Sequence, residues 1–117
     1  MNDIEHIDPD GWLPVATIHN GVVYLSGVVP AGEGSVAEQT RSVLDQIDER
    51  LARCGTSKHN LLEVSIWLKD IATFDDMNPV YIEWLDGILP PSRACVEAKL
   101  ANPDWAVEIR VSAVVPG

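Results

Sequence analysis

The residues best suited to chemistry in this sequence stand close together near position 93. Pro90 and Pro91 fix φ and lack a backbone N–H, so they mark a turn, and a strand is expected from about residue 92. Because side chains alternate along a strand, one face carries Arg93, Cys95 and Glu97, and the other carries Ala94, Val96 and Ala98. We expect the second face to point toward the core. Arg93 would then present its planar fork of donors at the mouth of a strand, where it could clamp a carboxylate; the alternative is a surface arginine paired with an acidic neighbour.

The composition restricts the class of protein. The 117 residues are enough for one domain with its own core, without the help of disulfides or metals. There are 8 basic and 18 acidic residues, which give a formal net charge of -10, and no stretch is rich in lysine and arginine. This balance argues against nucleic acid or an anionic membrane as a partner.

The cysteines and histidines indicate neither a disulfide nor a metal site. Cys54 and Cys95 have no metal or redox spacing, and a reduced setting explains them more simply than a bridge does. His6, His19 and His59 stand in or beside expected turns, as surface groups, without the spacing of metal ligands. The N-terminal residues lack the pattern of a signal peptide, and no apolar run approaches the roughly 20 residues of a membrane span. We therefore expect a cytoplasmic protein.

The elements that must position Arg93 follow from turn signals and periodicity. Strands are expected at about 13–18 and 22–29 around the hairpin signal Asn20-Gly21, and a helix between the capping box of Ser35 and Glu38 and a terminating Gly55. A strand at 61–69, a helix over about 74–88 and strands at about 92–99 and 105–115 complete the order β-β-α-β-α-β-β. This order predicts an α+β fold in which two helices cover one face of a mixed sheet.

Two further features of the sheet follow from the same strands. Gly27 lies inside the second strand, which indicates a bulge or a place where another backbone or a ligand comes close. The face without helices is expected to carry Ser26, Trp67, Cys95, Val114 and either Tyr24 or Leu25, with few charges. Because large apolar patches are rarely left exposed on monomers, we expect this face to pack against other subunits.

Several stretches together resemble a known family. These are NGVVYLSGVVP at 20–30, QTRSVLDQI at 39–47, and PSRACVE at 91–97 with VEI at 107–109. In this order and spacing they resemble the RidA/YjgF/L-PSP family, most closely its YoaB-like branch, over about residues 12–115. The resemblance implies a chorismate-mutase-like fold and a homotrimer whose sheets form an inner barrel, with three clefts between subunits.

The resemblance also implies an activity, the hydrolysis of reactive 2-imino and 2-enamino acids to 2-keto acids and ammonia, without a cofactor. In active members the arginine that matches Arg93 holds the substrate carboxylate, and the backbone around the cysteine that matches Cys95 contacts the imine nitrogen. Ser26 is expected to donate a hydrogen bond to the ligand. Water would then add to a C=N carbon that is already electrophilic. Covalent catalysis by Cys95 is not expected, because no histidine stands at a motif spacing from it.

Two positions depart from the pattern of active members. Those members carry Glu-x-Glu on the last strand, whereas this chain has Glu108-Ile109-Arg110. Glu108 and Arg110 share a strand face, so Arg110 either pairs with Glu108 or adds a second cation to the cleft and favours a larger or dicarboxylic anion. The Pro-Tyr that leads into the first strand is also absent, and Trp12 stands near its place. Trp12 could serve as an aromatic lid, but we expect a packed structural tryptophan.

These residues leave three functions from different classes. The first, which we favour, is an imine or enamine deaminase with Arg93 as the carboxylate anchor. The second is a non-catalytic trimer that binds small carboxylates as a sensor or metabolic partner, which Arg110 in place of the glutamate favours. The third is the endoribonuclease activity sometimes attached to the family, which the net charge of -10 and the lack of a basic aromatic groove oppose.

Overall fold

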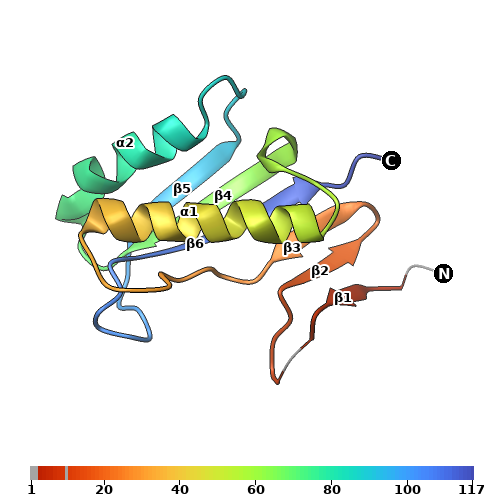
Figure 1. Ribbon diagram of the computed structural model, residues 1–117, viewed down its shortest axis with the longest axis horizontal. Helices are drawn as coiled ribbons and strands as arrows, with labels where there is room; N and C mark the ends of the chain where they lie inside the picture. The colour runs from red at the N-terminus through yellow and green to blue at the C-terminus, as the bar shows by residue number, and fades with distance from the viewer. Residues whose placement is uncertain (1–2, 10) are drawn as a thin grey trace.

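The computed structural model describes residues 3–9 and 11–117. Met1, Asn2 and Asp10, which belong to the polar N-terminal segment expected before the first strand, lie outside the described residues. The strands are β1 (Glu5–Ile7), β2 (Ala16–His19), β3 (Val22–Leu25), β4 (Leu61–Leu68), β5 (Ser92–Glu97) and β6 (Val107–Val114). The helices are α1 (Val36–Arg53) and α2 (Phe74–Trp84), with short 3-10 turns at Lys58–Asn60 and Ile71–Thr73. The predicted α+β class is confirmed, with one strand more than the sequence indicated (Figure 1).

The additional strand is β1, at the edge of the sheet. It pairs antiparallel with β2, so that Glu5 lies opposite Ile18 and Ile7 opposite Ala16. Three residues with exposed Glu5 and His6 are too few to produce a readable alternation of apolar and polar side chains. The strand exists because β2 offers it a partner, which the local sequence does not reveal.

The sheet is mixed, as predicted, and its strand order is β1-β2-β3-β6-β4-β5. β4 and β5 are parallel, joined through α2, and all other pairs are antiparallel. The last strand in sequence, β6, therefore lies at the centre, between β3 and β4. β5, which carries Arg93, lies at the edge opposite β1.

The predicted turn and cap signals have their expected geometry. Asn20 and Gly21 both have positive φ, 51° and 77°, which closes the hairpin between β2 and β3. The Ser35 hydroxyl accepts a hydrogen bond from the Glu38 backbone N–H, and the Glu38 carboxylate accepts one from the Ser35 N–H. Gly55, with φ of 82°, follows the end of α1. These local signals fix where the long helix begins and ends.

The core lies between the sheet and the two helices, which Figure 1 shows on the same side of the strands. Its buried side chains come from one stripe of each helix and from alternate positions of the central strands. They include Val43, Leu44, Ile47 and Leu51 of α1, Met77, Tyr81 and Trp84 of α2, and Leu25, Val64, Ile66, Leu68, Val107, Ile109 and Val111 of the sheet. Along β4 and β6 the buried side chains stand at alternate positions, Val64, Ile66 and Leu68 on one strand and Val107, Ile109 and Val111 on the other.

The two faces of β5 are the reverse of our expectation. Arg93, Cys95 and Glu97 lie beside Val64, Ile66 and Leu68 of β4 and so share the helix-covered face. The expected core residues point the other way, and Val96 is 51% exposed. The predicted alternation of side chains was correct, but the two faces were assigned the wrong way round. Arg93 and Glu97 can lie on the helix-covered face because they stand at the sheet edge, where long side chains can leave the core.

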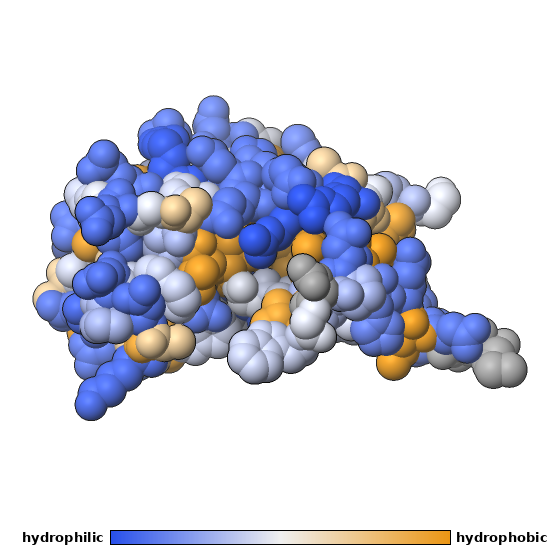
Figure 2. Space-filling view, turned by 60° about the horizontal axis from the view of Figure 1, so that its bottom comes forward, coloured by the Kyte–Doolittle hydropathy of each residue, from blue (hydrophilic) through white to orange (hydrophobic). Residues whose placement is uncertain are grey.

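The open face of the sheet carries Tyr24, Trp67 and Val114, as predicted, together with Glu63, Ser65, Glu108, Arg110 and Ser112. Cys95 and Leu25, which were also expected there, lie on the helix side instead. The open face is therefore more polar than the sequence suggested. On the side of the molecule seen in Figure 2, hydrophilic side chains surround apolar ones gathered near the middle.

Among the described residues, neither helix is both long enough and apolar enough to cross a lipid bilayer.

Candidate active site

Arg93 is held by side chains of α2 at the outer edge of the sheet. Its Nη1 donates a hydrogen bond of 2.6 Å to Oδ1 of Asn78. Its guanidinium carbon lies 4.9 Å from the ring centre of Tyr81 and 5.4 Å from that of Phe74. Of the three nitrogens of the Arg93 guanidinium, only Nη1 has a hydrogen-bond partner within residues 3–9 and 11–117, and no ion pair involves this side chain. The guanidinium is thus oriented while most of its donors stay free, and the predicted alternative of an acidic partner is wrong.

The spacing of residues on α2 explains how this support forms. Phe74, Asn78 and Tyr81 stand at positions i, i+4 and i+7, so they share one face of the helix. Because α2 is the crossover between the parallel strands β4 and β5, that face lies beside the edge strand that carries Arg93.

Tyr81 is the most buried member of this support. The residue is 5% exposed, and among the described residues its hydroxyl has no hydrogen-bond partner. Burial raises the pKa of the Tyr81 hydroxyl, and the positive charge of Arg93 offsets only part of that rise. Tyr81 therefore stays neutral and presents a ring face to the guanidinium.

Cys95 lies two residues beyond Arg93 and packs partly against the core. Burial raises the pKa of the Cys95 thiol, and the nearby charge of Arg93 lowers it by less. A thiol with a raised pKa is a poor nucleophile at neutral pH. This agrees with the expectation that the side chain takes no covalent part in catalysis.

Ser26 and Glu108 both lie near the end of β3. Ser26 donates its hydroxyl to the Pro14 carbonyl at 2.7 Å, so its oxygen can still accept a hydrogen bond. A Cβ built on Gly27 would collide with Oε2 of Glu108, so only glycine lets this carboxylate lie against the chain. The group that comes close to Gly27 is thus a side chain, whereas the sequence indicated another backbone or a ligand. Pairing also shifts by one residue here, since Tyr24 lies opposite Ser112 but Val28 opposite Ile109, which is the predicted bulge.

Arg110 lies on the same open face and leans toward β3. Its Nε donates a hydrogen bond of 3.1 Å to the Leu25 carbonyl. In the described chain no ion pair joins it to Glu108, so the first alternative predicted for Arg110 does not hold. Its two terminal nitrogens remain available to a ligand.

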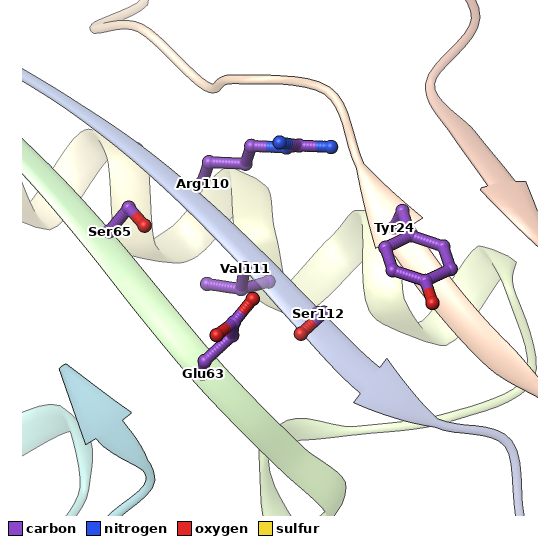
Figure 3. A pocket seen from close by; sticks show the side chains of 6 residues that line it. All are labelled: Tyr24, Glu63, Ser65, Arg110, Val111 and Ser112. Atoms are coloured by element: carbon purple, nitrogen blue, oxygen red, sulfur yellow. The ribbon is translucent and has the colours of Figure 1, made fainter.

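The five predicted site residues therefore form two clusters. Arg93 and Cys95 lie at the β5 edge on the helix side, whereas Ser26, Glu108 and Arg110 lie around the end of β3. A hollow beside Arg93 is lined by Glu63, Val64, Ser65, Ser92, Arg93 and Ala94. A second hollow is lined by Tyr24, Glu63, Ser65, Arg110, Val111 and Ser112 (Figure 3). The two hollows share Glu63 and Ser65, so they are neighbours.

Comparison with known proteins identifies the family. The family model described as "Endoribonuclease L-PSP" matches residues 5–115. A RutC family protein of Haemophilus influenzae is 44% identical over 94% of this chain and 97% of its own, and the RutC family protein YoaB of Escherichia coli is 35% identical over 96% and 98%. The crystal structure of a YjgF family member from Neisseria meningitidis superposes with a TM-score of 0.94, at 42% identity over 98% of this chain and 97% of that one.

This chain belongs to the L-PSP family. Another relative, from Acinetobacter baylyi, is named 3-aminoacrylate deaminase RutC and is 36% identical over 80% of this chain and 79% of its own. The resemblance seen in the sequence, including the YoaB-like branch, is confirmed.

The structure adds site residues to this L-PSP chain that the sequence analysis did not single out. Asn78 and Phe74 support Arg93. The sequence could have indicated them, because they are four residues apart and lie on the same face of the helix as Tyr81. Glu63 and Ser65 line both hollows. They alternate with the buried residues of β4, which could have indicated that their side chains point to the open face.

Other expectations for this L-PSP chain need correction. Trp12, expected to be packed, is 95% exposed, because the loop before β2 runs over the surface. His19 is partly buried, and its Nδ1 has no partner among the described residues, whereas His6 and His59 are exposed as expected. In the described part of the chain, no group of three or more His, Cys, Asp or Glu side chains could hold a metal ion.

Proposed function

We propose that this protein hydrolyses reactive 2-imino and 2-enamino acids to 2-keto acids and ammonia, with Arg93 as the anchor for the substrate carboxylate. The observation that carries the proposal is that the Arg93 side chain is already oriented for binding. Its guanidinium is fixed by Asn78 and two aromatic rings while most of its donors remain free. An arginine held in this way can bind a carboxylate through two parallel hydrogen bonds at little further cost in side-chain entropy. The relative named 3-aminoacrylate deaminase supports the same reaction class.

Hydrolysis of an imine requires few catalytic groups, because the C=N carbon is already electrophilic. The carboxylate bound at Arg93 fixes the position of the adjacent C=N carbon, and water adds to that carbon to form a carbinolamine. Collapse of the carbinolamine breaks the C–N bond and releases ammonia and the 2-keto acid. We propose that the backbone at Cys95, two residues along β5 from Arg93, contacts the imine nitrogen of a substrate anchored in this way. Orientation of the substrate is then the main contribution to the rate.

We propose that the complete site forms between subunits of a homotrimer. In one chain, Arg93 and Cys95 lie on the helix side of the sheet edge, whereas Ser26 and Glu108 lie by the end of β3. β5 leaves one edge without a strand partner in the described chain, and the open face exposes Tyr24, Val96 and Val114. Packing of these surfaces against other copies would cover apolar area and would bring the Arg93 cluster of one chain opposite the Ser26 and Glu108 cluster of another.

A second candidate function is a trimer that binds small carboxylates without turning them over. Arg110 favours it, because a guanidinium stands where active members carry a glutamate, and a guanidinium cannot act as a base. This alternative shares Arg93 as the carboxylate anchor, so only turnover separates the two.

The deciding experiment generates imines in the presence of the protein. An amino-acid oxidase converts apolar, basic and acidic amino acids to 2-imino acids, and semicarbazide traps the imine that remains. A deaminase suppresses trapping in proportion to its concentration, and Arg93→Ala abolishes the suppression. Unchanged trapping with every imine, together with carboxylate binding that depends on Arg93, would identify the non-catalytic trimer instead.

A further inference from the structure

Two cations lie at opposite ends of a buried aromatic pair on α2. Trp84 and Tyr81 are 8% and 5% exposed, and their ring centres are 6.1 Å apart with an angle of 44° between the planes. The guanidinium carbon of Arg93 lies 4.9 Å from the centre of the Tyr81 ring, and Nζ of Lys58 lies 5.4 Å from that of the Trp84 ring. A continuous chain of contacts therefore joins Lys58 to Arg93 through the two rings.

Lys58 holds the end of α2 as well as the Trp84 ring. It stands in the 3-10 turn between α1 and β4, and its Nζ donates a hydrogen bond of 2.6 Å to the carbonyl of Trp84, the last residue of α2. The last turn of α2 contains no basic residue, so Lys58 supplies from another element the positive charge that stabilises a helix C-terminus. Asp48 of α1 fixes the ring, because its Oδ1 accepts a hydrogen bond of 3.1 Å from Nε1 of Trp84.

The sequence of α2 by itself stabilises this helix only weakly. The helix has 11 residues, and isolated helices shorter than roughly 12–15 residues are marginal in water. Pro79 lies inside it, where a proline removes one hydrogen bond of the helix, and Thr73 at its start makes no side-chain cap. Contacts from other elements must therefore determine where the last turn, which carries Tyr81, lies against β5.

Lys58 lies outside the site proposed for hydrolysis. Together with Asp48 and Trp84 it lines a hollow of about 250 Å³ between α1 and α2. Among the described residues, this hollow shares no lining residue with the hollows beside Arg93 and Arg110. An effect of Lys58 on a carboxylate at Arg93 must therefore pass through the protein, and not through direct contact with the ligand.

We propose that Lys58 is a positioning residue for Arg93, and that it acts through Trp84 and Tyr81. Its charge holds the last turn of α2 and the Trp84 ring, and Trp84 in turn packs against Tyr81. Tyr81 then presents its ring face to the guanidinium. The effect expected on KM rests on the function proposed above for Arg93. The orientation of the guanidinium does not, because it can be measured without a ligand.

The first measurement follows the Arg93 side chain in the ligand-free protein, by proton–nitrogen correlation NMR with isotope-labelled arginine. The Nε–Hε signal that is absent from Arg93→Lys identifies Arg93, and the nearby rings of Tyr81 and Phe74 displace this signal from the shift of a free arginine. Lys58→Met keeps an unbranched side chain but loses the charge, so the signal should move toward the free-arginine shift. Lys58→Arg keeps a cationic donor and should leave the signal near its native position.

The second measurement separates binding from turnover, with the imines and the semicarbazide assay described above. Lys58→Met should raise KM by about threefold to tenfold and change kcat by less than about twofold, the size expected of a change along a chain of packed side chains. Lys58→Arg should restore KM. In a Tyr81→Leu background the chain of rings is interrupted, so Lys58→Met should have no further effect on KM.

Other variants control for the loss of a lysine and for folding. Lys69→Met is the matched control, since Lys69 also donates to a backbone carbonyl, that of Pro103, and KM and the Arg93 signal should be unchanged. Asp48→Ala removes the acceptor for the Trp84 indole, whereas Asp48→Asn keeps one, so KM should rise only in the first. Should Lys58→Met fail to fold, the two Asp48 variants carry the test.

Three outcomes would overturn the proposal. They are an Arg93 signal that is unchanged in both Lys58→Met and Asp48→Ala, equal effects from Lys69→Met, and a loss of activity in Lys58→Met that follows the amount of folded protein while KM stays native. The last would mean that Lys58 serves only the stability of the fold. Failure of the proposed function differs from all three, because the native protein would then neither hydrolyse imines nor bind carboxylates, and the Arg93 signal would still decide the role of Lys58.

Discussion

Asn78 on α2 accepts a hydrogen bond of 2.6 Å from Nη1 of Arg93 on β5. The orientation of the arginine is therefore set by the packing of the helix against the edge of the sheet, and not by the strand alone. Phe74 and Tyr81 from the same helix face complete the support. The residues around this pair give the first predictions.

Arg93→Ala should abolish carboxylate binding and imine hydrolysis, because the charged anchor is lost. Arg93→Lys keeps the charge but loses the planar fork and its contact with the rings, so kcat/KM should fall by about tenfold or more. Steady-state kinetics and carboxylate titration measure both. Sedimentation of Arg93→Ala should match that of the native protein, and a change in assembly would show that Arg93 is structural instead.

Asn78→Ala should raise KM more than it lowers kcat, because the guanidinium loses its orientation but keeps its charge. We expect a rise of about tenfold, the value of one hydrogen bond to a charged group. Asn78→Asp is the informative partner variant, since a carboxylate of the same shape would pair with Arg93 and compete with the substrate. An Asn78→Asp enzyme with normal KM would contradict this role.

Gly27→Ala should destabilise the fold by about 1 kcal/mol, because the new methyl group meets Oε2 of Glu108. The colliding atom is the end of a flexible side chain, so the cost stays at the low end for overpacking. Glu108→Ala should remove most of this penalty in the double variant. Urea unfolding of the four proteins in the cycle gives the coupling energy, and additive effects would show that the two residues do not touch.

Cys95→Ala should leave kcat close to that of the native enzyme. Burial raises the pKa of the thiol, which keeps it protonated, and the contact proposed for the imine nitrogen uses the backbone. The same semicarbazide assay measures the rate. A large loss of kcat with unchanged assembly would show that the thiol itself takes part.

Glu38 should make the stability of the fold depend on pH. Hydrogen bonds from the Ser35 backbone and hydroxyl lower the pKa of Glu38 from its ordinary value of 4.5. Because the pKa of Glu38 is lower in the folded protein than in the unfolded chain, its ionised form stabilises the fold at any pH above the ordinary pKa. This contribution is lost as the pH falls through the lowered pKa of the folded state. Glu38→Gln keeps the side-chain acceptor but cannot ionise. The stability difference between native protein and Glu38→Gln, measured by urea unfolding, should therefore shrink below about pH 4.5, and a constant difference would contradict the role of the charge.

Much of the fold could be predicted because its signals are local. Asn20-Gly21 closes the first hairpin, Ser35 and Glu38 begin the long helix, and Gly55 ends it. Each of these depends on φ angles or hydrogen bonds within a few residues, which the neighbouring sequence controls. Strand β1 could not be predicted, because three mostly exposed residues become a strand only when β2 pairs with them.

The candidate site was predicted in part. The strand after Pro91 that carries Arg93 and the bulge at Gly27 followed from residue type and position. The face of β5 did not, because the long side chains of Arg93 and Glu97 can leave the core at the sheet edge, so their polarity does not show which face is covered by the helices. Asn78 stands 15 residues from Arg93, and only the crossover through α2 brings the two side chains together.

The sequence by itself determined the order of the elements after β1, the turns, the family and the residue types that can bind a carboxylate, because local backbone preferences and side-chain chemistry belong to the residues themselves. The tertiary structure alone decided that Arg93 is held by α2 and that Arg110 and Glu63 stand apart across one hollow. Strand pairing and helix packing between distant parts of the chain determine which side chains meet. The register of β6 between β3 and β4, for example, is stabilised by contacts between residues that are far apart in the sequence.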